Sequence, residues 1–106
     1  MAGGSSRRRI VLDLNSPAFL DVFLRLESSD LLQVAKSLDR IRKLDWATVY
    51  QATGLNWEAI RHIRTSSGTT AYSVRLSKKI RAIAYRDGEF LRFISLHPDH
   101  DSAYRS

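Results

Sequence analysis

Side chains that bind phosphate and side chains that move protons are concentrated in the last third of this sequence. Guanidinium and ammonium groups bind phosphate oxygens, and imidazole exchanges protons near neutral pH because its unperturbed pKa is about 6.5. The basic residues in question are Arg75, Lys78, Lys79, Arg81 and Arg92, and the histidines are His97 and His100. Together these groups could bind a phosphodiester and transfer a proton on it.

A metal site is an alternative use of the histidine-rich ending. His97, Asp99, His100 and Asp101 supply two imidazoles and two carboxylates within five residues, and such donors suit divalent metals. A further interpretation is that His100 and Asp101 only cap a turn near the C-terminus. We predict no metal, no other cofactor and no small-molecule ligand. The chain has no paired-carboxylate hydrolase signature, no Ser/His/Asp motif and no glycine-rich phosphate loop.

The composition is that of a small basic protein. The chain has 106 residues, no cysteine and a net charge of +6, from 17 Lys and Arg against 11 Asp and Glu. Such a charge favours a polyanionic partner without choosing among RNA, DNA and an acidic peptide. Disulfides and thiolate metal sites are excluded, and no apolar run reaches the ~18–20 residues that span a membrane. We therefore expect a cytoplasmic protein with no membrane partner.

The elements that position these residues belong to one predicted α+β domain. Residues 1–9 should form a flexible basic N-terminus, in which the Arg7-Arg8-Arg9 run is either a nucleic-acid arm or a solvated end, and residues 10–106 the folded part. Ser16 suits a helix N-cap and Pro17 the first helical position. The predicted elements are a strand over 10–14, a helix from Pro17 to about Glu27, a helix over about 31–44, and strands over 57–64, 72–76, 80–86 and 89–97. A helix is the alternative for 57–64, because Trp57, Ile60 and Ile63 also fit a helical period.

The order of these elements is β-α-α-β-β-β-β, with an N-terminal strand, an antiparallel helical hairpin and an antiparallel sheet packed on it. The second helix carries an apolar stripe that we expect in the core. The stripe comprises Leu31, Val34, Ala35, Leu38 and Ile41. Segment 45–56 contains Trp46, Val49, Tyr50 and Leu55, so we expect it to be ordered and to pack on the domain.

Pairing across a predicted Asp87-Gly88 turn assigns the last two strands to faces. Arg86 would pair with Glu89, Ala84 with Leu91, Ala82 with Phe93, and Arg81 with Ile94. The face packed on the helices would hold Ile80, Ala82, Ala84, Leu91 and Phe93, and the opposite face Arg81, Ile83, Tyr85, Phe90, Arg92 and Ile94. A three-residue loop over 77–79 would add Val74 to the packed face and place Arg75 beside Arg81.

The uncovered face has two interpretations. It is either an ordinary exposed surface whose arginine stems cover isoleucines, or a surface for phosphates and bases. Like charges on neighbouring strands cost energy unless an anion lies between them, which favours the second. In this register His97 falls on the helix-packed face, unless the strand bulges or stops beside Pro98.

The last third of the chain resembles a known protein superfamily. The motifs are Tyr72-Ser73-Val74-Arg75-Leu76, then a strand with the early arginine Arg81, then Tyr85-Arg86-Asp87-Gly88, and a final strand that ends at His97. These motifs and the order of elements are similar to those of the RelE/ParE toxins of type II toxin–antitoxin systems. The architecture corresponds over about 10–104 and the motifs over about 72–104.

The resemblance implies a fold and two kinds of activity, since the superfamily contains ribosome-dependent mRNA-cleaving toxins and gyrase inhibitors. In the nuclease branch Arg81 would contact the scissile phosphate, and His97 or Tyr104 would transfer a proton. Glu58 is the candidate for the glutamate base that some members use. The histidine-bearing ending favours the nuclease over the gyrase inhibitor, and a catalytically degenerate protein that only binds an antitoxin is a third possibility.

The chemistry expected of the nuclease branch requires no metal, because RNA supplies the 2′-hydroxyl nucleophile. A base removes its proton, an acid protonates the leaving 5′-oxygen, and cations neutralise the phosphate. His97 or His100 would move protons, with Glu58 as an alternative base. The expected RNA-binding residues are Arg75, Lys78, Lys79, Arg92 and Tyr85, with Phe90 or Tyr104 as further stacking groups. The implied partners are mRNA, the ribosome and an antitoxin with an acidic or amphipathic segment.

Overall fold

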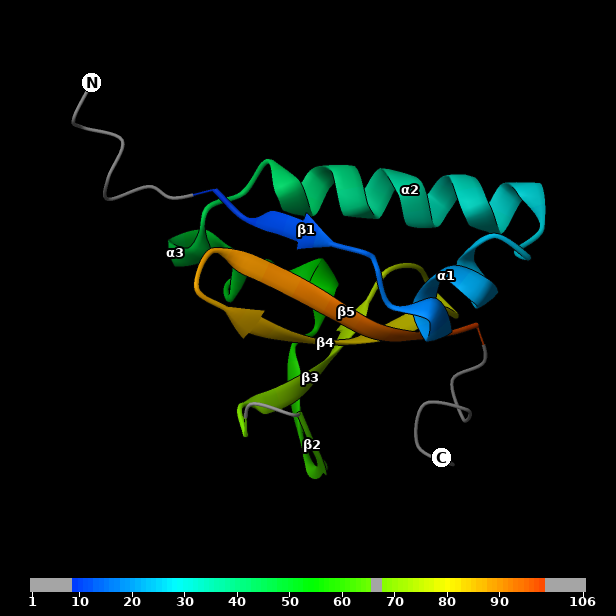
Figure 1. The fold of residues 1–106 in the computed structure, drawn as a ribbon. Coiled ribbons are helices and arrows are strands. Elements are labelled where there is room, and N and C mark those ends of the chain that lie inside the picture. The colour runs from blue at the N-terminus through cyan, green and yellow to red at the C-terminus, as the bar shows by residue number, and fades with distance from the viewer. Residues whose placement is uncertain (1–8, 66–67, 99–106) are drawn as a thin grey trace.

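The computed structural model describes residues 9–65 and 68–98, which form an α+β fold (Figure 1). The five strands form a single mixed sheet in the order β1-β5-β4-β3-β2. In chain order the elements are β1 (Val11–Asp13), α1 (Pro17–Phe23), α2 (Ser28–Arg42), α3 (Trp46–Val49), η2 (Thr53–Leu55), β2 (Glu58–Arg64), β3 (Thr70–Arg75), β4 (Arg81–Asp87) and β5 (Phe90–His97). Within this part of the chain, no helix is long and apolar enough to cross a lipid bilayer.

The predicted α+β class and all seven predicted elements are present, but the sheet is not wholly antiparallel. Strands β2 to β5 pair antiparallel, whereas β1 lies parallel to β5 at one edge of the sheet. The long connection through the helices and β2–β4 allows this arrangement, because parallel neighbours require a crossover. Strand β4 therefore lies at the centre of the sheet, flanked by β3 and β5.

Helix α2 packs on the sheet through one side, although that side differs from the predicted stripe. Val34, Leu38 and Ile41 are buried as expected, but Ala35 is exposed. Ser37 is buried in its place, where its hydroxyl donates a hydrogen bond to the carbonyl of Leu76. A polar side chain thus tolerates burial because it finds a backbone acceptor at the end of β3. The helix also begins at Ser28, earlier than predicted.

Helix α1 is shorter than predicted and makes a strong contact with β5. It ends at Phe23 instead of near Glu27. Phe19 is completely buried, and its ring lies 5.3 Å from that of Phe93. Ser16 occupies the N-cap position, but its side chain makes no capping hydrogen bond. Its Oγ instead donates to the carbonyl of Ile94, 2.6 Å away on β5.

The two faces of the sheet carry the residues that alternation predicts. The main core, between the sheet and the helices, includes the predicted residues Ile80, Ala82, Ala84, Leu91, Phe93 and Val74. On the opposite face Ile60, Ala71 and Ile83 form a small buried cluster with the partly buried Ile94. The sheet therefore buries apolar side chains on both sides near its centre.

The predicted register of the last hairpin is wrong by two residues. Asp87 pairs with Phe90 and Arg86 with Leu91, so the loop residues are Gly88 and Glu89. Gly88 adopts φ +63° at the first loop position, where a type II′ hairpin turn favours glycine. A shift of two residues leaves each side chain on its predicted face, because side chains alternate with a period of two.

A β-bulge in β5 changes the face of the strand's last residues. Ala84 pairs with Phe93, but its neighbour Ile83 pairs with Ser95, so Ile94 is the extra residue. Beyond the bulge Ala82 pairs with Leu96. An extra residue reverses which side chains point to each face of the sheet. The uninterrupted register, which would put His97 on the helix-packed face, is therefore wrong, and the alternative of a bulged strand is correct.

Candidate functional site

Three predicted site residues lie in one row across the three inner strands β3, β4 and β5, at the end of each strand. Arg75 of β3 is the register partner of Arg81 on β4, and Arg81 is the register partner of His97 on β5. Directly paired residues of antiparallel strands share a face and have Cα atoms about 5 Å apart. The residue next to each of them along its strand, Val74, Ala82 or Leu96, belongs to the main core. Because side chains alternate between faces, the row lies on the face opposite the helices.

Arg81 is on the predicted face but does not project into solvent. Only 7% of its surface is exposed, whereas Arg75 is exposed. The burial follows from the central position of β4, because a long side chain there is covered by the residues of both neighbouring strands. A guanidinium keeps its charge when it is buried, and a charge in a poorly solvated site interacts more strongly with a nearby anion.

His97 is held in a form suited to accepting a proton. Burial lowers the pKa of the imidazole below its usual value of 6.5, because desolvation penalises the charged ring. The ring's Nε2 lies 2.9 Å from the hydroxyl of Ser95, two residues earlier on the same face. This hydrogen bond orients the ring. Ser95 was not among the predicted site residues, although its spacing of two from His97 is the signal that could have identified it.

Glu58 lies on the same face but farther from His97 than Arg81 does. It is the first residue of β2, is exposed, and pairs with Ser73 of β3. Two strand spacings of about 4.8 Å separate β2 from β4, and a third separates β4 from β5. The backbone therefore places His97 next to Arg81 and leaves Glu58 at the edge of the row.

Ser73 is a polar residue on the same face of the sheet as the row. It is completely buried between Glu58 and Ile83, its partners on the two neighbouring strands. Its Oγ has no hydrogen-bond partner among the described residues. A buried hydroxyl without a partner costs free energy.

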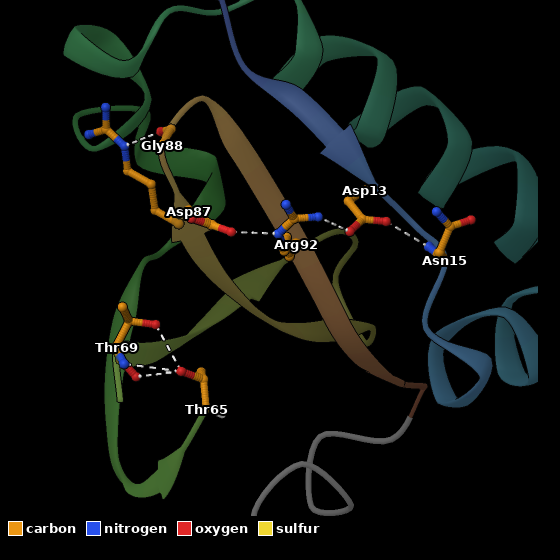
Figure 2. Close-up of polar contacts among 8 residues, drawn as sticks. Asp13, Asn15, Thr65, Thr69, Asp87, Gly88 and Arg92 are labelled. Carbon is orange, nitrogen blue, oxygen red and sulfur yellow. Dashed lines mark hydrogen bonds and ion pairs between the residues drawn. The ribbon is translucent and has the colours of Figure 1, made fainter. Parts of the chain in front are cut away.

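Arg92 is on the predicted face but is neutralised by two carboxylates. Figure 2 shows its guanidinium between Asp13 of β1 and Asp87 at the end of β4, at 2.5 and 2.9 Å. The same group lies over the ring of Phe90, 4.5 Å from its centre. Arg92 pairs with the half-buried Tyr85 in the ladder. The structure thus shows Arg92 joining three strands, with its charge balanced within the protein.

The remaining predicted residues differ in their surroundings. Lys79 is held by an ion pair with Asp30 at 3.4 Å, whereas Lys78 lines a cavity beside α2. His100 and Tyr104 lie outside the described residues, as do Asp99 and Asp101 of the alternative metal site. Within 9–65 and 68–98, no group of three or more potential metal ligands is found.

Comparisons with known proteins do not assign the chain to a family. A scan against protein-family models found no match, and neither the curated proteins nor the solved structures gave one. Any functional assignment therefore depends on the side chains themselves.

The chemistry of the row is that of a cationic binding site next to a proton acceptor. Two guanidiniums on adjacent strands attract a singly charged or doubly charged oxyanion, and the neutral imidazole beside them can take a proton from a group held there. The row contains Arg75, Arg81 and His97, with Ser95 orienting the ring.

Proposed function

We propose that this chain is a metal-independent endoribonuclease toxin of the RelE/ParE superfamily, which cleaves ribosome-bound mRNA and so inhibits translation. The observation that carries the proposal is the placement of Arg81 beside His97 on the face opposite the helices. The α+β fold and the motifs over 72–104 are compatible with it. A cognate antitoxin with an acidic or amphipathic segment would neutralise the protein by covering this face.

In the proposed reaction the RNA supplies the nucleophile. The imidazole of His97 takes the proton of the 2′-hydroxyl as the 2′-oxygen forms its bond to phosphorus. Arg81 and Arg75 neutralise the non-bridging oxygens, whose charge grows as the phosphorus becomes five-coordinate. The bond from phosphorus to the 5′-oxygen then breaks, and that oxygen takes a proton from His100 or Tyr104. The products are a 2′,3′-cyclic phosphate and a 5′-hydroxyl.

Cleavage by the purified chain tests this assignment. We expect wild-type protein that has been treated with EDTA and then desalted to cleave ribosome-bound mRNA in a Mg²⁺ buffer, which keeps the ribosome assembled, and to leave 2′,3′-cyclic phosphate ends. His97→Gln should reduce the rate by about 10²–10⁴-fold, the usual contribution of a general base. Arg81→Lys keeps the charge but loses the planar fork that binds two phosphate oxygens, so it should also reduce the rate. The control is Arg42→Gln, which removes one positive charge from α2, an element that contributes no residue to the row.

Circular dichroism and thermal unfolding of each variant separate a chemical defect from a folding defect. A folded His97→Gln protein that cleaves at the wild-type rate would exclude His97 as the base. Loss of cleavage after the EDTA treatment, with recovery when a transition metal is added back, would exclude the metal-independent reaction.

Pulse labelling after expression in bacterial cells distinguishes the superfamily's alternatives. We expect amino-acid incorporation to stop before thymidine incorporation. The opposite order would identify a gyrase inhibitor, and normal incorporation of both would leave a protein that only binds its antitoxin.

A further inference from the structure

A cavity of about 210 Å³ lies where α2, η2 and the end of β3 meet. It is open to solvent and lies at the strand end next to the Arg75–Arg81–His97 row. Its lining residues are Ser37, Arg40, Gly54, Leu55, Arg75, Leu76, Ser77 and Lys78. Three of these are basic and none is acidic, so the electrostatic potential in the cavity is positive.

The three basic lining residues come from three different segments. Arg40 belongs to α2, Arg75 to β3, and Lys78 to the loop between β3 and β4. All three are exposed, and none of them forms an ion pair with an acidic residue in the described parts of the chain. Holding three cations around one cavity costs energy unless an anion compensates them.

Basic residues next to these three in the sequence form ion pairs with carboxylates. Arg42 and Lys43 both bind Asp39, at 2.8 and 3.0 Å. Lys79 binds Asp30 at 3.4 Å. The protein therefore balances the neighbouring charges internally but leaves those of the cavity for an external anion.

The hydroxyl groups of the cavity add one donor. The Oγ of Ser77 accepts a hydrogen bond from the backbone N–H of Ile80 at 3.1 Å. A hydroxyl can accept and donate at once, so the hydrogen of Ser77 can still be given to a ligand. The hydroxyl of Ser37 is already used, because it donates to the carbonyl of Leu76 and fixes α2 to β3 at the cavity floor.

The size of the cavity limits what it can contain. Its volume of about 210 Å³ corresponds to roughly seven water molecules at about 30 Å³ each. Pockets for whole drug-sized molecules are larger, about 300–1,000 Å³. One phosphate group and part of its hydration shell fit this space, and the rest of a larger ligand would extend from it into solvent.

Arg75 connects the cavity to the proposed cleavage site. It lines the cavity and is also the register partner of Arg81, the residue proposed to hold the scissile phosphate. Successive phosphates of an RNA strand are separated by a single nucleoside. The cavity lies on the α2 side at the end of β3, so a strand that leaves Arg81 would pass round this strand end, along Arg75, to reach it. We propose that this cavity binds the phosphate adjoining the scissile one in single-stranded RNA, an inference that depends on the proposed ribonuclease function.

Inorganic phosphate tests the anion site without any cleavage. The probe is titrated into the ¹⁵N-labelled full-length chain, and amide shifts are followed at 76–78. We expect saturable shifts there for wild type and their loss in an Arg40→Gln/Lys78→Gln double variant. A Lys36→Gln/Arg42→Gln double variant removes the same charge from α2 outside the cavity and should retain the shifts. Equal shifts in both variants, or none in the wild type, would overturn the site.

Binding of RNA under increasing salt tests what the anion belongs to. The probe is a short single-stranded RNA with one 2′-deoxy nucleotide at the cleavage position, which cannot be cut. Each neutralised phosphate contributes about −0.7 to the slope of log affinity against log salt. Arg40→Gln/Lys78→Gln loses the one phosphate held in the cavity and should therefore reduce the slope by about 0.7, whereas the α2 control should keep the wild-type slope. Between 50 and 200 mM salt this difference amounts to about 2.6-fold in affinity.

A neutral methylphosphonate next to the 2′-deoxy nucleotide completes the design. It should weaken binding to the wild type and leave the double variant unaffected. If phosphate shifts residues 76–78 but the RNA slope is unchanged, the cavity does not bind RNA and the proposal fails, while cleavage by the wild type can still be intact. If the wild type does not cleave RNA but the slope is reduced in Arg40→Gln/Lys78→Gln, the nuclease proposal is refuted and the proposed RNA-binding cavity is retained.

Discussion

Ser16 offers a direct test of how the fold positions His97. Its hydroxyl donates to the carbonyl of Ile94, the extra residue of the bulge in β5. The ladder between β1 and β5 ends at Asp13 and Arg92, so Ile94 lies beyond it, and Ser16 supplies a donor where the ladder has stopped. We expect Ser16→Ala to leave this carbonyl without that donor.

The expected loss follows from the partly buried position of this hydrogen bond. Leaving a buried acceptor unsatisfied costs about 1–3 kcal/mol, against a total stability of roughly 5–15 kcal/mol for a domain of this size. With an m-value of about 1–3 kcal/mol/M, the urea midpoint should fall by roughly 0.5–2 M. Urea unfolding followed by circular dichroism measures the change, and the NMR signals of the His97 ring report whether the strand end has moved.

Three further substitutions separate this role from helix capping. Aspartate is as good an N-cap as serine, but its carboxylate has no hydrogen to donate to a carbonyl. Ser16→Asp should therefore be at least as destabilising as Ser16→Ala, whereas Ser16→Thr should retain most of the stability. Ser29→Ala, at an exposed position in the first turn of α2, should change stability by less than about 0.5 kcal/mol. If Ser16→Asp is as stable as the wild type, the reasoning is refuted, and Ser16 stabilises the protein as the N-cap of α1.

Other predictions concern the packing of α1 and two titrating groups. Phe19→Ala should cost about 3–5 kcal/mol in urea unfolding, whereas Leu24→Ala, at a residue 70% exposed at the same helix's end, should cost little; equal losses would contradict the docking of α1. The backbone N–H of Asn15 and the guanidinium of Arg92 lower the pKa of Asp13. This carboxylate therefore stabilises the fold above pH 3.8, and its contribution disappears as the pH falls through the lowered pKa. Asp13→Asn should make stability depend less on pH in that part of an acid unfolding curve. Because burial lowers the pKa of His97, the unfolded state binds a proton first and stability should fall as pH drops below 6.5; an NMR titration midpoint at or above 6.5 would contradict this.

Alternation and turn chemistry predict the faces of the sheet better than they predict its register. Val74, Ala82 and Phe93 lie in the core as predicted, because the choice of face depends only on whether a position is odd or even. The register depends on which two residues form the loop, and Gly88-Glu89 replaced the expected Asp87-Gly88. Both choices place a glycine in a two-residue turn, so local sequence does not distinguish them.

The side chains that sequence reasoning misplaced are those whose partners are distant in the chain. Ser16 satisfies the local rule for a helix cap, yet it bonds to Ile94, 78 residues away. Ser37 occupies a buried position that hydrophobic periodicity assigns to an apolar residue, because the carbonyl of Leu76, directly after β3, is within its reach. Arg92 fits a binding surface by type and face, but two aspartates from other strands neutralise it. Tertiary contacts of this kind leave no periodic signal.

The bulge in β5 is the feature on which the proposed site depends. In an uninterrupted ladder His97 would face the core, where Leu96 now lies, and the imidazole would be separated from Arg81 by the sheet. The extra residue moves Leu96 into the core and His97 to the opposite face, so one local irregularity meets the requirements of packing and of chemistry together. Bulges lengthen one strand at the cost of ladder hydrogen bonds, and Ser16 offsets part of that cost from outside the strand. A site held in this way, on central strands and not on loops, has the rigidity that proton transfer to a fixed base requires.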